Sequence, residues 1–188
     1  MIHKYQMIYA DPPWSYRDKA NAGNRGASHK YSTMSLDSIK NLPVKDLADD
    51  NCALFLWVTM PLLPDCLSVI EAWGFKYKTV AFTWVKTHSP SGKFCVGMGN
   101  YTRANAEICI LATKGKMPVK SHSVRSLIVS PRREHSQKPD EARDGIVELF
   151  GDVPRIELFA RQRIEGWHAW GDQVPGGNDV ELDGEHFK

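Results

Sequence analysis

Short apolar runs alternate with amphipathic segments along most of this chain, and this alternation limits the folds open to it. The apolar runs are rich in β-branched and aromatic residues and lie at residues 7–10, 53–58, 79–85, 108–112, 127–129 and 156–160. Segments with helical spacing lie between several of them, at residues 36–42, 62–73 and 140–150. Continuously apolar strands that alternate with helices are typical of a mostly parallel sheet covered on both faces. We therefore expect an α/β fold with a mostly parallel sheet flanked by helices.

The 188 residues, of which 42% are hydrophobic, suit one domain with a substantial core. Polar, glycine-containing stretches at residues 15–33 and 87–103 are predicted to be long surface loops, and such loops are commonly functional. A tail with alternating acidic and apolar residues begins at a pair of glycines. We expect a single domain over residues 1–175 and an acidic, partly disordered tail over residues 176–188.

Basic charge is concentrated in the middle of the chain. Residues 86–138 carry ten Lys or Arg against two Asp or Glu, whereas residues 139–188 carry five against twelve. Such a concentration suits a surface that binds a polyanion, because each cation near a phosphate releases condensed counterions. The charge distribution alone does not distinguish a polyanion-binding surface from basic side chains dispersed over a solvated surface.

The four cysteines point to buried thiols rather than zinc ligands or disulfides. Cys52, Cys66, Cys95 and Cys109 include no CxxC pair, and most of them sit in apolar patterns. No HxxxH or HxxE pattern suggests a metal site. No apolar stretch approaches the ~18 residues of a membrane span, and the N-terminus lacks the features of a signal peptide. We expect a cytoplasmic protein that uses neither a metal nor a membrane.

The stretch "MIYADPPWSY" at residues 7–16 ends an apolar run against two prolines. Proline fixes φ and holds the preceding residue extended, so the chain leaves the strand rigidly at Asp11 and Pro12. Ligands of open α/β sheets bind at the carboxyl ends of strands, where Asp11 lies. The Asp11 carboxylate and the Pro12 carbonyl are placed to accept the two hydrogens of a planar NH2 group, while Trp14 or Tyr31 stacks on its ring. A Pro-Pro turn with Trp14 merely packed is the structural alternative.

Such a site recognises an amine and also favours its reaction. The amine's lone pair is delocalised into the ring, and holding both hydrogens out of plane favours attack by that lone pair. An ionised Asp11 offsets the positive charge that builds on the nitrogen as an alkyl group is transferred.

The "DPPW" at residues 11–14 resembles the amino-methyltransferase signature of Asp or Asn, Pro, Pro and an aromatic residue. Further blocks follow in order: "YSTMS" (31–35), "LFLWVT" (54–59), "WVKT" (84–87), "HSQKPDEA" (135–142), "RIELFAR" (155–161) and "WGDQV" (170–174). Together they resemble the MTA-seventy family, which includes the catalytic subunit of mRNA adenosine N6-methyltransferase and DNA adenine methyltransferases of bacteria and phages. The resemblance extends from about residue 5 to residue 174.

This resemblance implies a Rossmann-like, S-adenosylmethionine-dependent methyltransferase fold in permuted motif order, with the catalytic strand before the cofactor strand. That order fits the lack of a GxGxxG motif after any predicted strand. The implied catalytic residues are Asp11, Pro12, Pro13 and Trp14, with Trp14 and Tyr31 against the target base. The implied cofactor-binding residues are Asp11, Lys138, Glu157, Leu158, Arg161 and Gln173. No metal is implied.

Two of these residues have a physical reading of their own. Glu157 is an acid in an apolar run, which is costly unless it is paired. The resemblance also implies that Lys138 reaches the cofactor's carboxylate or a substrate phosphate. Its position before a helix start, which favours anions, is compatible with this role, and a solvated lysine is the alternative that the residue alone favours. Asp172 stands where the mRNA enzyme has Asn, which leaves open the ribose contacts of Asp172 and of Gln162 or Arg163.

We predict an S-adenosylmethionine-dependent methyltransferase of the adenine N6 amine, with DNA favoured over RNA and the base flipped or single-stranded. The nucleic-acid backbone is expected to lie against Lys86, Lys93, Arg103, Arg132 and Arg133. The alternatives are methylation of RNA adenine or of another amine such as that of cytosine, a non-catalytic nucleic-acid-binding subunit, and a methyltransferase for free nucleotides or proteins. The target sequence, the strand preference, the need for a partner subunit, and the choice between monomer and homodimer stay open.

Overall fold

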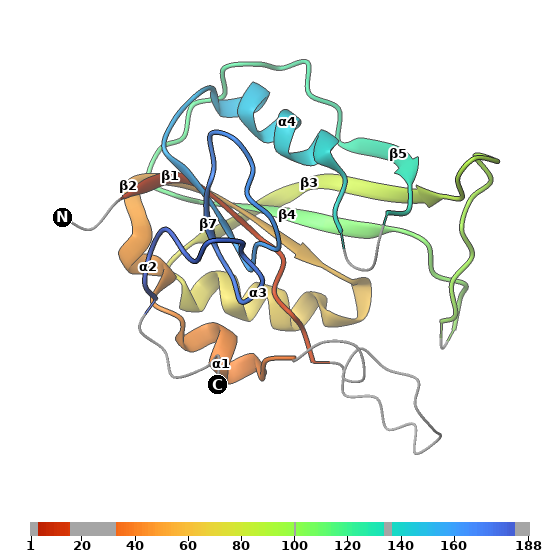
Figure 1. The fold of residues 1–188 in the computed structure, drawn as a ribbon, viewed down its shortest axis with the longest axis horizontal. Coiled ribbons are helices and arrows are strands. Elements are labelled where there is room, and N and C mark those ends of the chain that lie inside the picture. Colours follow the sequence, from red (N-terminus) through yellow and green to blue (C-terminus); the bar gives the residue numbers. More distant parts are fainter. Residues whose placement is uncertain (1–3, 16–32, 100, 134–136, 183–188) are drawn as a thin grey trace.

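A seven-stranded sheet forms the centre of the computed structural model, which describes residues 4–15, 33–99, 101–133 and 137–182 (Figure 1). The strands are β1 (Tyr5–Ala10), β2 (Ala48–Val58), β3 (Lys76–Thr87), β4 (Glu107–Lys114), β5 (Leu127–Pro131), β6 (Arg155–Leu158) and β7 (His168–Trp170). Their order across the sheet is β5-β3-β4-β2-β1-β6-β7, and within this described sheet β4 alone runs against the others. The predicted mostly parallel α/β fold is confirmed, and each expected apolar run contributes to a strand.

Strand β1 is an interior strand of the sheet and pairs in parallel on both sides. Ile8 lies opposite Leu54 of β2 and opposite Ile156 of β6. Ala10 at the end of β1 is paired with Leu158 at the end of β6. The carboxyl ends of two strands that are far apart in the chain therefore meet at one edge of the sheet, with β1 earlier in the sequence than β6.

Helices cover both faces of this sheet (Figure 1). One face carries α1 (Leu36–Asn41), α2 (Val44–Leu47), the 3-10 turn η2 (Met60–Leu62) and α3 (Leu63–Ala72), and the other carries α4 (Asp140–Phe150). Side chains of β1 alternate between the two layers, as strand geometry dictates. Ile8 belongs to the core cluster of α1 and α3, whereas Met7 and Tyr9 belong to the cluster of α4.

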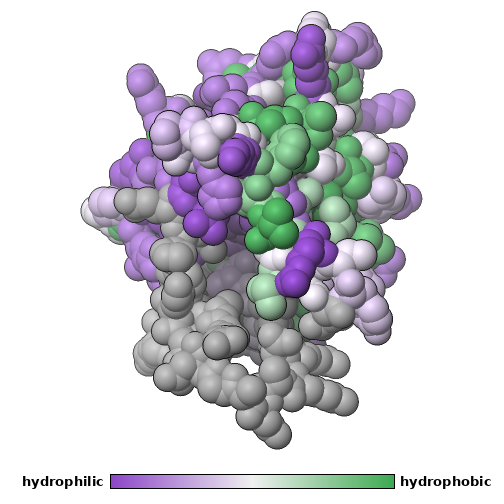
Figure 2. Space-filling view, turned by 90° about the vertical axis from the view of Figure 1, so that its right-hand side faces the viewer, coloured by the Kyte–Doolittle hydropathy of each residue, from purple (hydrophilic) through white to green (hydrophobic). Residues whose placement is uncertain are grey.

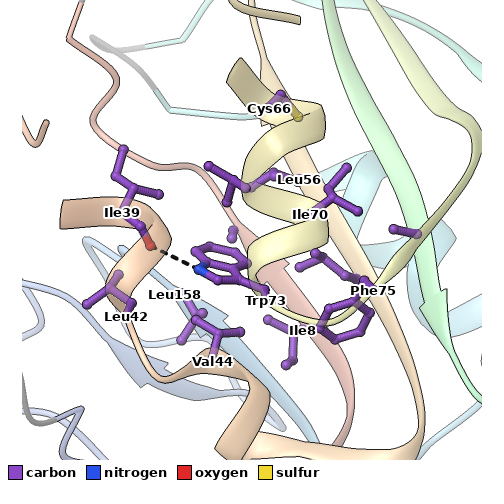
Figure 3. Packing of buried hydrophobic residues seen from close by; sticks show 14 of the residues in the cluster. Ile8, Ile39, Leu42, Val44, Leu56, Cys66, Ile70, Trp73, Phe75 and Leu158 are labelled. Atoms are coloured by element: carbon purple, nitrogen blue, oxygen red, sulfur yellow. Dashed lines mark hydrogen bonds between the residues drawn. The ribbon is translucent and has the colours of Figure 1, made fainter. Parts of the chain in front are cut away.

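Trp73 fills the centre of the layer beneath the sheet (Figure 3). Its side chain is fully buried, and its indole N–H donates to the Ile39 carbonyl at 2.9 Å. This bond satisfies a donor that would be costly to bury unpaired, and it links α3 to α1. Gly74 and Gly151, which the sequence marks as helix stops, follow α3 and α4 with φ of 81° and 85°.

Two parts of the chain differ from expectation. Strand β5 is the edge strand beside β3, so Leu127 and Val129 on its outer face are exposed rather than buried. Residues 176–182 pack on the domain instead of being disordered: the Asp179 carboxylate accepts from the Ala169 backbone N–H at 2.8 Å, and Leu182 is buried in the same core cluster as Ile8. Residues 183–188 lie outside the described part.

All four cysteines are buried and free, as predicted. Within the described ranges, none of the helices has both the length and the apolar character needed to traverse a bilayer.

Candidate active site

A pocket of about 790 Å³ lies at the carboxyl edge of β1 and β6. Its walls are formed by Asp11, Trp84, Lys86, Glu107, Arg132, Arg133, Gln137, Lys138, Arg143, Glu157, Phe159, Arg161, Gln162 and Gln173. The volume is in the range of small-molecule sites, roughly 300–1,000 Å³. The structure thus brings together five residues that were predicted to bind a cofactor: Asp11, Lys138, Glu157, Arg161 and Gln173.

Asp11 leaves the end of β1 and meets Lys138 across the pocket wall. The Lys138 Nζ lies 2.7 Å from Asp11 Oδ2, and the two side chains are 8% and 23% exposed. Burial raises the pKa of Asp11, and the Lys138 ammonium opposes this rise without cancelling it. A carboxyl with a raised pKa at the end of the central strand suits a role in proton transfer.

Lys138 is shared with a second carboxylate, Glu107 at the start of β4. The Lys138 Nζ lies 3.2 Å from Glu107 Oε2, and Lys86 pairs with the other oxygen of Glu107. Burial alone would raise the pKa of Glu107, but the two ammonium groups lower it overall. Burial likewise disfavours the charged form of Lys138, and its two carboxylates outweigh burial and raise its pKa. Lys86, Glu107, Lys138 and Asp11 form a row of alternating charges, which we call the lysine–carboxylate chain.

A second buried charge cluster lies behind β6. Arg143 of α4 binds both oxygens of Glu157, with Nε–Oε2 and Nη2–Oε1 distances of 2.8 Å each. Its Nη1 also lies 3.0 Å from Asp140, and its guanidinium packs over the Tyr9 ring at 5.4 Å. Burial alone would lower the pKa of Arg143, but Glu157 more than compensates and raises it. We call Arg143 and Glu157 the arginine–carboxylate pair.

This pair changes the interpretation of Glu157. The expected role was a contact with the ribose or adenosine of the cofactor, whereas both carboxylate oxygens already accept from Arg143. Any ligand contact therefore has to use the remaining lone pairs. The pairing also explains how an acid is tolerated in an apolar strand. Sequence reasoning missed Arg143, although its signal is present: it occupies a buried face of α4 together with Ala142 and Ile146.

Leu158, which the resemblance placed at the cofactor, is not among the residues that line the pocket, whereas the next residue, Phe159, is. Leu158 was predicted to bind the cofactor, but its side chain is fully buried in the core cluster that includes Ile8, so only its backbone is available at the edge. Phe159 follows with φ of 60°, an unusual conformation for a bulky residue, and its side chain lines the pocket. Its ring meets Trp170 edge-on at 5.4 Å. A strained residue at a pocket edge is a common functional signature.

Trp14 departs from the expected base-stacking platform. Its side chain is 8% exposed and lies in the core cluster, and its indole N–H donates to the Trp57 carbonyl at 2.9 Å. The backbone around it is also engaged, because Trp14 forms an isolated bridge with Met34 and its N–H donates to the Pro12 carbonyl at 2.8 Å. The packed alternative thus describes Trp14 in this structure. Tyr31 lies outside the described residues.

The predicted backbone-binding cations do not form one group. Lys86, Arg132 and Arg133 line the pocket, while Lys93 and Arg103 lie in the long loop between β3 and β4. The charge of Lys86 is offset by Glu107, and Arg133 pairs with Asp140 and Glu141. The predicted surface is therefore less basic at the pocket than the count of Lys and Arg suggests.

The residues left open around the ribose also separate. Gln162 lines the pocket, whereas Asp172 is an exposed residue that does not. Arg163 turns to the C-terminal segment, where Nη1 contacts Asp179 at 2.9 and 3.0 Å and Nε donates to the Pro175 carbonyl at 2.9 Å. Arg163 therefore holds the chain end against the domain.

A mostly parallel sheet with an acid after β1, and a pocket across the ends of β1 and β6, defines a Rossmann-like α/β fold with a candidate small-molecule site. Residues 5–173 match the MT-A70 family, so the chain belongs to the MT-A70 family of methyltransferases. The resemblance noted from the sequence is confirmed.

Relatives agree with this membership. The Type II methyltransferase M.MunI of Mycoplasma sp is 38% identical over 198 residues, which cover 95% of this chain and 81% of that protein. An N(6)-adenosine-methyltransferase MT-A70-like protein of Arabidopsis thaliana is 32% identical over 182 residues, 94% of this chain and 24% of that protein. The N(6)-adenosine-methyltransferase catalytic subunit METTL3 of Homo sapiens is 30% identical over 183 residues, 94% of this chain and 29% of that protein. The chain thus spans most of the first relative and about a quarter of the other two.

Proposed function

We propose that the chain transfers a methyl group from S-adenosylmethionine to the exocyclic N6 amine of adenine in DNA. The observation that carries this proposal is the position of Asp11, which follows the carboxyl end of β1 and lies in the wall of a pocket of about 790 Å³, with Pro12 next to it in the chain. Adenine is supported by the N(6)-adenosine methyltransferases among the relatives. DNA is supported by the Type II methyltransferase, whose length is close to that of this chain, and by the DNA-acting members that the sequence resembles.

The pocket suits a zwitterionic cofactor. S-adenosylmethionine has a positive sulfonium, an ammonium and a carboxylate, and it supplies an electrophilic methyl group when bound. The pocket wall carries both signs of charge, from Asp11 and Glu157 on one hand and Arg161 on the other, with the Phe159 ring and the Gln173 amide beside them. These residues are assigned to hold the cofactor, together with the backbone at Leu158.

Asp11 and Pro12 hold the amine. Lys138 binds Asp11 Oδ2, so Oδ1 is assigned to accept one amine hydrogen. The Pro12 carbonyl already accepts the Trp14 N–H and keeps its second lone pair for the other hydrogen. Held in this way, the nitrogen directs its lone pair toward the methyl donor, and the Asp11 carboxylate stabilises the positive charge and takes the proton that the amine releases. A raised pKa makes Asp11 a better proton acceptor than an ordinary aspartate.

The test is the isosteric change Asp11→Asn, with Glu71→Gln on the exposed face of α3 as the matched control. Methyl transfer to unmethylated double-stranded DNA is expected to fall by a factor of about 1,000 or more in Asp11→Asn, since the charge-stabilising acceptor is lost. Binding of S-adenosylmethionine, measured by calorimetry, is expected to stay within a few-fold of wild type. Unchanged methyl transfer in Asp11→Asn would contradict the proposed mechanism.

Labelled-methyl assays with single- and double-stranded DNA and RNA, with and without adenine, test the substrate class. Transfer to RNA alone would favour the second candidate, RNA adenine methylation, which the MT-A70-like relatives support. Transfer to DNA by the purified chain would exclude the need for a partner subunit. We place the enzyme in the cytoplasm, since free buried cysteines are usual in a reducing compartment.

A further inference from the structure

The loop between β3 and β4, residues 88–105, exposes large hydrophobic side chains to an unusual degree, and we call it the finger. Phe94 is 63% exposed, Val96 73%, Met98 86% and Tyr101 fully exposed. Single exposed apolar residues are ordinary, but several on one loop indicate an interaction site. Neither the proposed chemistry nor the core of the domain accounts for them.

The finger has a shape that its own backbone defines. At its base the Lys86 carbonyl accepts from the Cys95 N–H at 2.8 Å and from the Asn105 amide at 2.9 Å. Further out, the Gly97 N–H donates to the Ala104 carbonyl at 2.6 Å. A Cβ on Gly97 would lie 2.6 Å from the Ala104 oxygen, so the two limbs approach as closely as they do because glycine stands here.

A second glycine, Gly99, is also needed for a close approach of the backbone. A Cβ on Gly99 would lie 2.0 Å from the Thr102 oxygen, so this turn also requires glycine. Gly97 and Gly99, which do not follow a strand as the glycines of a nucleotide-binding motif would, are thereby explained by these close approaches of the backbone. Met98 and Tyr101 lie close to these glycines in the sequence, and both side chains are exposed.

The finger stands beside the candidate active site. Lys86 before it and Glu107 after it both line the pocket. In Figure 1 the finger projects beyond the ends of β3 and β4, on the right of the view. Figure 2 turns this side of the molecule to the viewer, and hydrophobic side chains gather over it with hydrophilic ones to either side.

The positive charge of the finger favours a nucleic acid as its binding partner. Residues 88–106 contain no Asp or Glu, and they contain Lys93 and Arg103. Arg103 Nη1 lies 2.9 Å from the Met98 sulfur, which sets a cation directly beside the apolar tip. Apolar wedges flanked by cations are how proteins enter the stacked bases of a nucleic acid while they hold its phosphates.

We propose that Met98 and Tyr101 insert between base pairs of duplex DNA next to the target adenine, while Lys93 and Arg103 contact the phosphates. The inserted side chains fill the space that the adenine leaves when it rotates into the pocket, and so they stabilise the flipped state. This inference rests on the proposed function, since it gives the finger the same substrate as the pocket.

The test compares the double variant Met98→Ser/Tyr101→Ser with the control Tyr77→Ser/Val119→Ser, which removes exposed apolar side chains outside the finger and the pocket. Methyl transfer is measured on one unmethylated DNA in its duplex form and after heat denaturation. The finger variant is expected to lose at least tenfold on the duplex and to stay within threefold of wild type on the denatured strands, because a single-stranded base needs no wedge. The control is expected to resemble wild type on both.

A second measurement is independent of methyl transfer. Base insertion unwinds DNA, so wild-type protein bound to closed circular plasmid during topoisomerase relaxation should change the linking number, and the finger variant should not. Equal losses on duplex and single strands, or unwinding that survives in the finger variant, would overturn the inference. The inference would also be overturned if wild-type protein did not unwind DNA. It would be overturned as well if the finger variant changed the sedimenting mass of the protein but kept its activity on duplex DNA. If the wild-type protein unwinds DNA but methylates none, the proposed function is contradicted, whereas the inference that the finger inserts into DNA holds.

Discussion

Two buried charge clusters flank the same pocket and differ in how tightly their geometry is set. In the arginine–carboxylate pair, a planar guanidinium binds both oxygens of Glu157 at 2.8 Å. In the lysine–carboxylate chain, the Lys138 ammonium is shared between Asp11 at 2.7 Å and Glu107 at 3.2 Å. A guanidinium fork fixes a carboxylate in orientation, whereas an ammonium on a flexible stem is a point charge that changes partners readily.

This difference in geometry suggests that the arginine–carboxylate pair supports the structure and that the lysine–carboxylate chain takes part in the reaction. Arg143 fixes the wall of the pocket behind β6, and its partner Glu157 has little freedom to move. Asp11 keeps an oxygen that Lys138 does not bind, and Lys138 has a second carboxylate to turn to when a ligand approaches Asp11. We therefore expect changes in the first cluster to act mainly on stability and changes in the second mainly on rate and pH dependence.

The largest effect is expected from Arg143→Met. It leaves the Glu157 carboxylate buried without its partner, and breaking a buried pair in this way costs about 3–5 kcal/mol of unfolding free energy. Urea denaturation followed by circular dichroism measures the loss. Arg143→Lys keeps the charge without the fork and should lose less. A loss below about 1 kcal/mol in Arg143→Met would remove the distinction between the two clusters.

The next effect is expected from Lys138→Met, in the pH dependence of methyl transfer. Burial raises the pKa of Asp11 and Lys138 lowers it, so removal of Lys138 raises this pKa further. The ionised form needed for catalysis is then lost at a higher pH as the solution is acidified, and the acid limb of the rate profile moves up. We expect a rate loss of about 10- to 100-fold near neutral pH. Lys138→Arg, which keeps the charge, should leave the limb close to wild type.

A smaller effect of opposite sign is expected from Glu107→Gln. The Glu107 carboxylate raises the pKa of Asp11, so its neutralisation lowers that pKa, and Lys138 is left with Asp11 as its charged neighbour. The acid limb should move down, with a rate change of about 2- to 10-fold. The pH–rate profiles of Lys138→Met and Glu107→Gln are measured side by side. Acid limbs that move in the same direction in both variants would show that the lysine–carboxylate chain does not act through Asp11.

The smallest effect is expected from Arg132→Ala at the rim of the pocket. Loss of one phosphate contact should reduce the slope of log affinity against log salt by about 1 and leave the fold intact. Fluorescence anisotropy with duplex DNA at several salt concentrations measures this slope. Arg125→Ala, outside the pocket, is the control, and equal slopes in wild type and Arg132→Ala would exclude Arg132 from the DNA-binding surface.

The parts of the site that depend on local chain rules were predictable, and the parts that depend on partners were not. Two prolines after an apolar run place Asp11 at a strand end whatever surrounds it. By contrast, the partners of Glu157 and Lys138 come from α4 and β4. The helical spacing of α4 places Arg143 on the buried face with Ala142 and Ile146, but it does not say which carboxylate Arg143 meets, and nothing in the chain indicates that Glu107 reaches Lys138. Trp14 shows the same limit, because its sequence position suited either stacking or packing, and a carbonyl on β2 decided for packing.

The C-terminal segment was misjudged for a related reason. Its alternation of acids with apolar residues, after two glycines, is typical both of a frayed end and of a final edge strand. Arg163 and the Ala169 N–H supply partners for Asp179, and Leu182 is buried in the core cluster that contains Ile8. The composition of the segment carries no information about the residues elsewhere in the fold that bind Asp179 and pack against Leu182.

The central position of β1 has a consequence for how this protein is made. Met7 is paired with Arg155, so one side of the middle strand stays open until the ribosome has produced nearly the whole described chain. Strand pairings this distant in sequence form slowly, and the exposed edge meanwhile is a site for association with other chains. Asp11, which directly follows β1, is therefore synthesised well before Lys138 and β6, its neighbours in the fold, and assistance from chaperones should raise the yield of correctly folded protein.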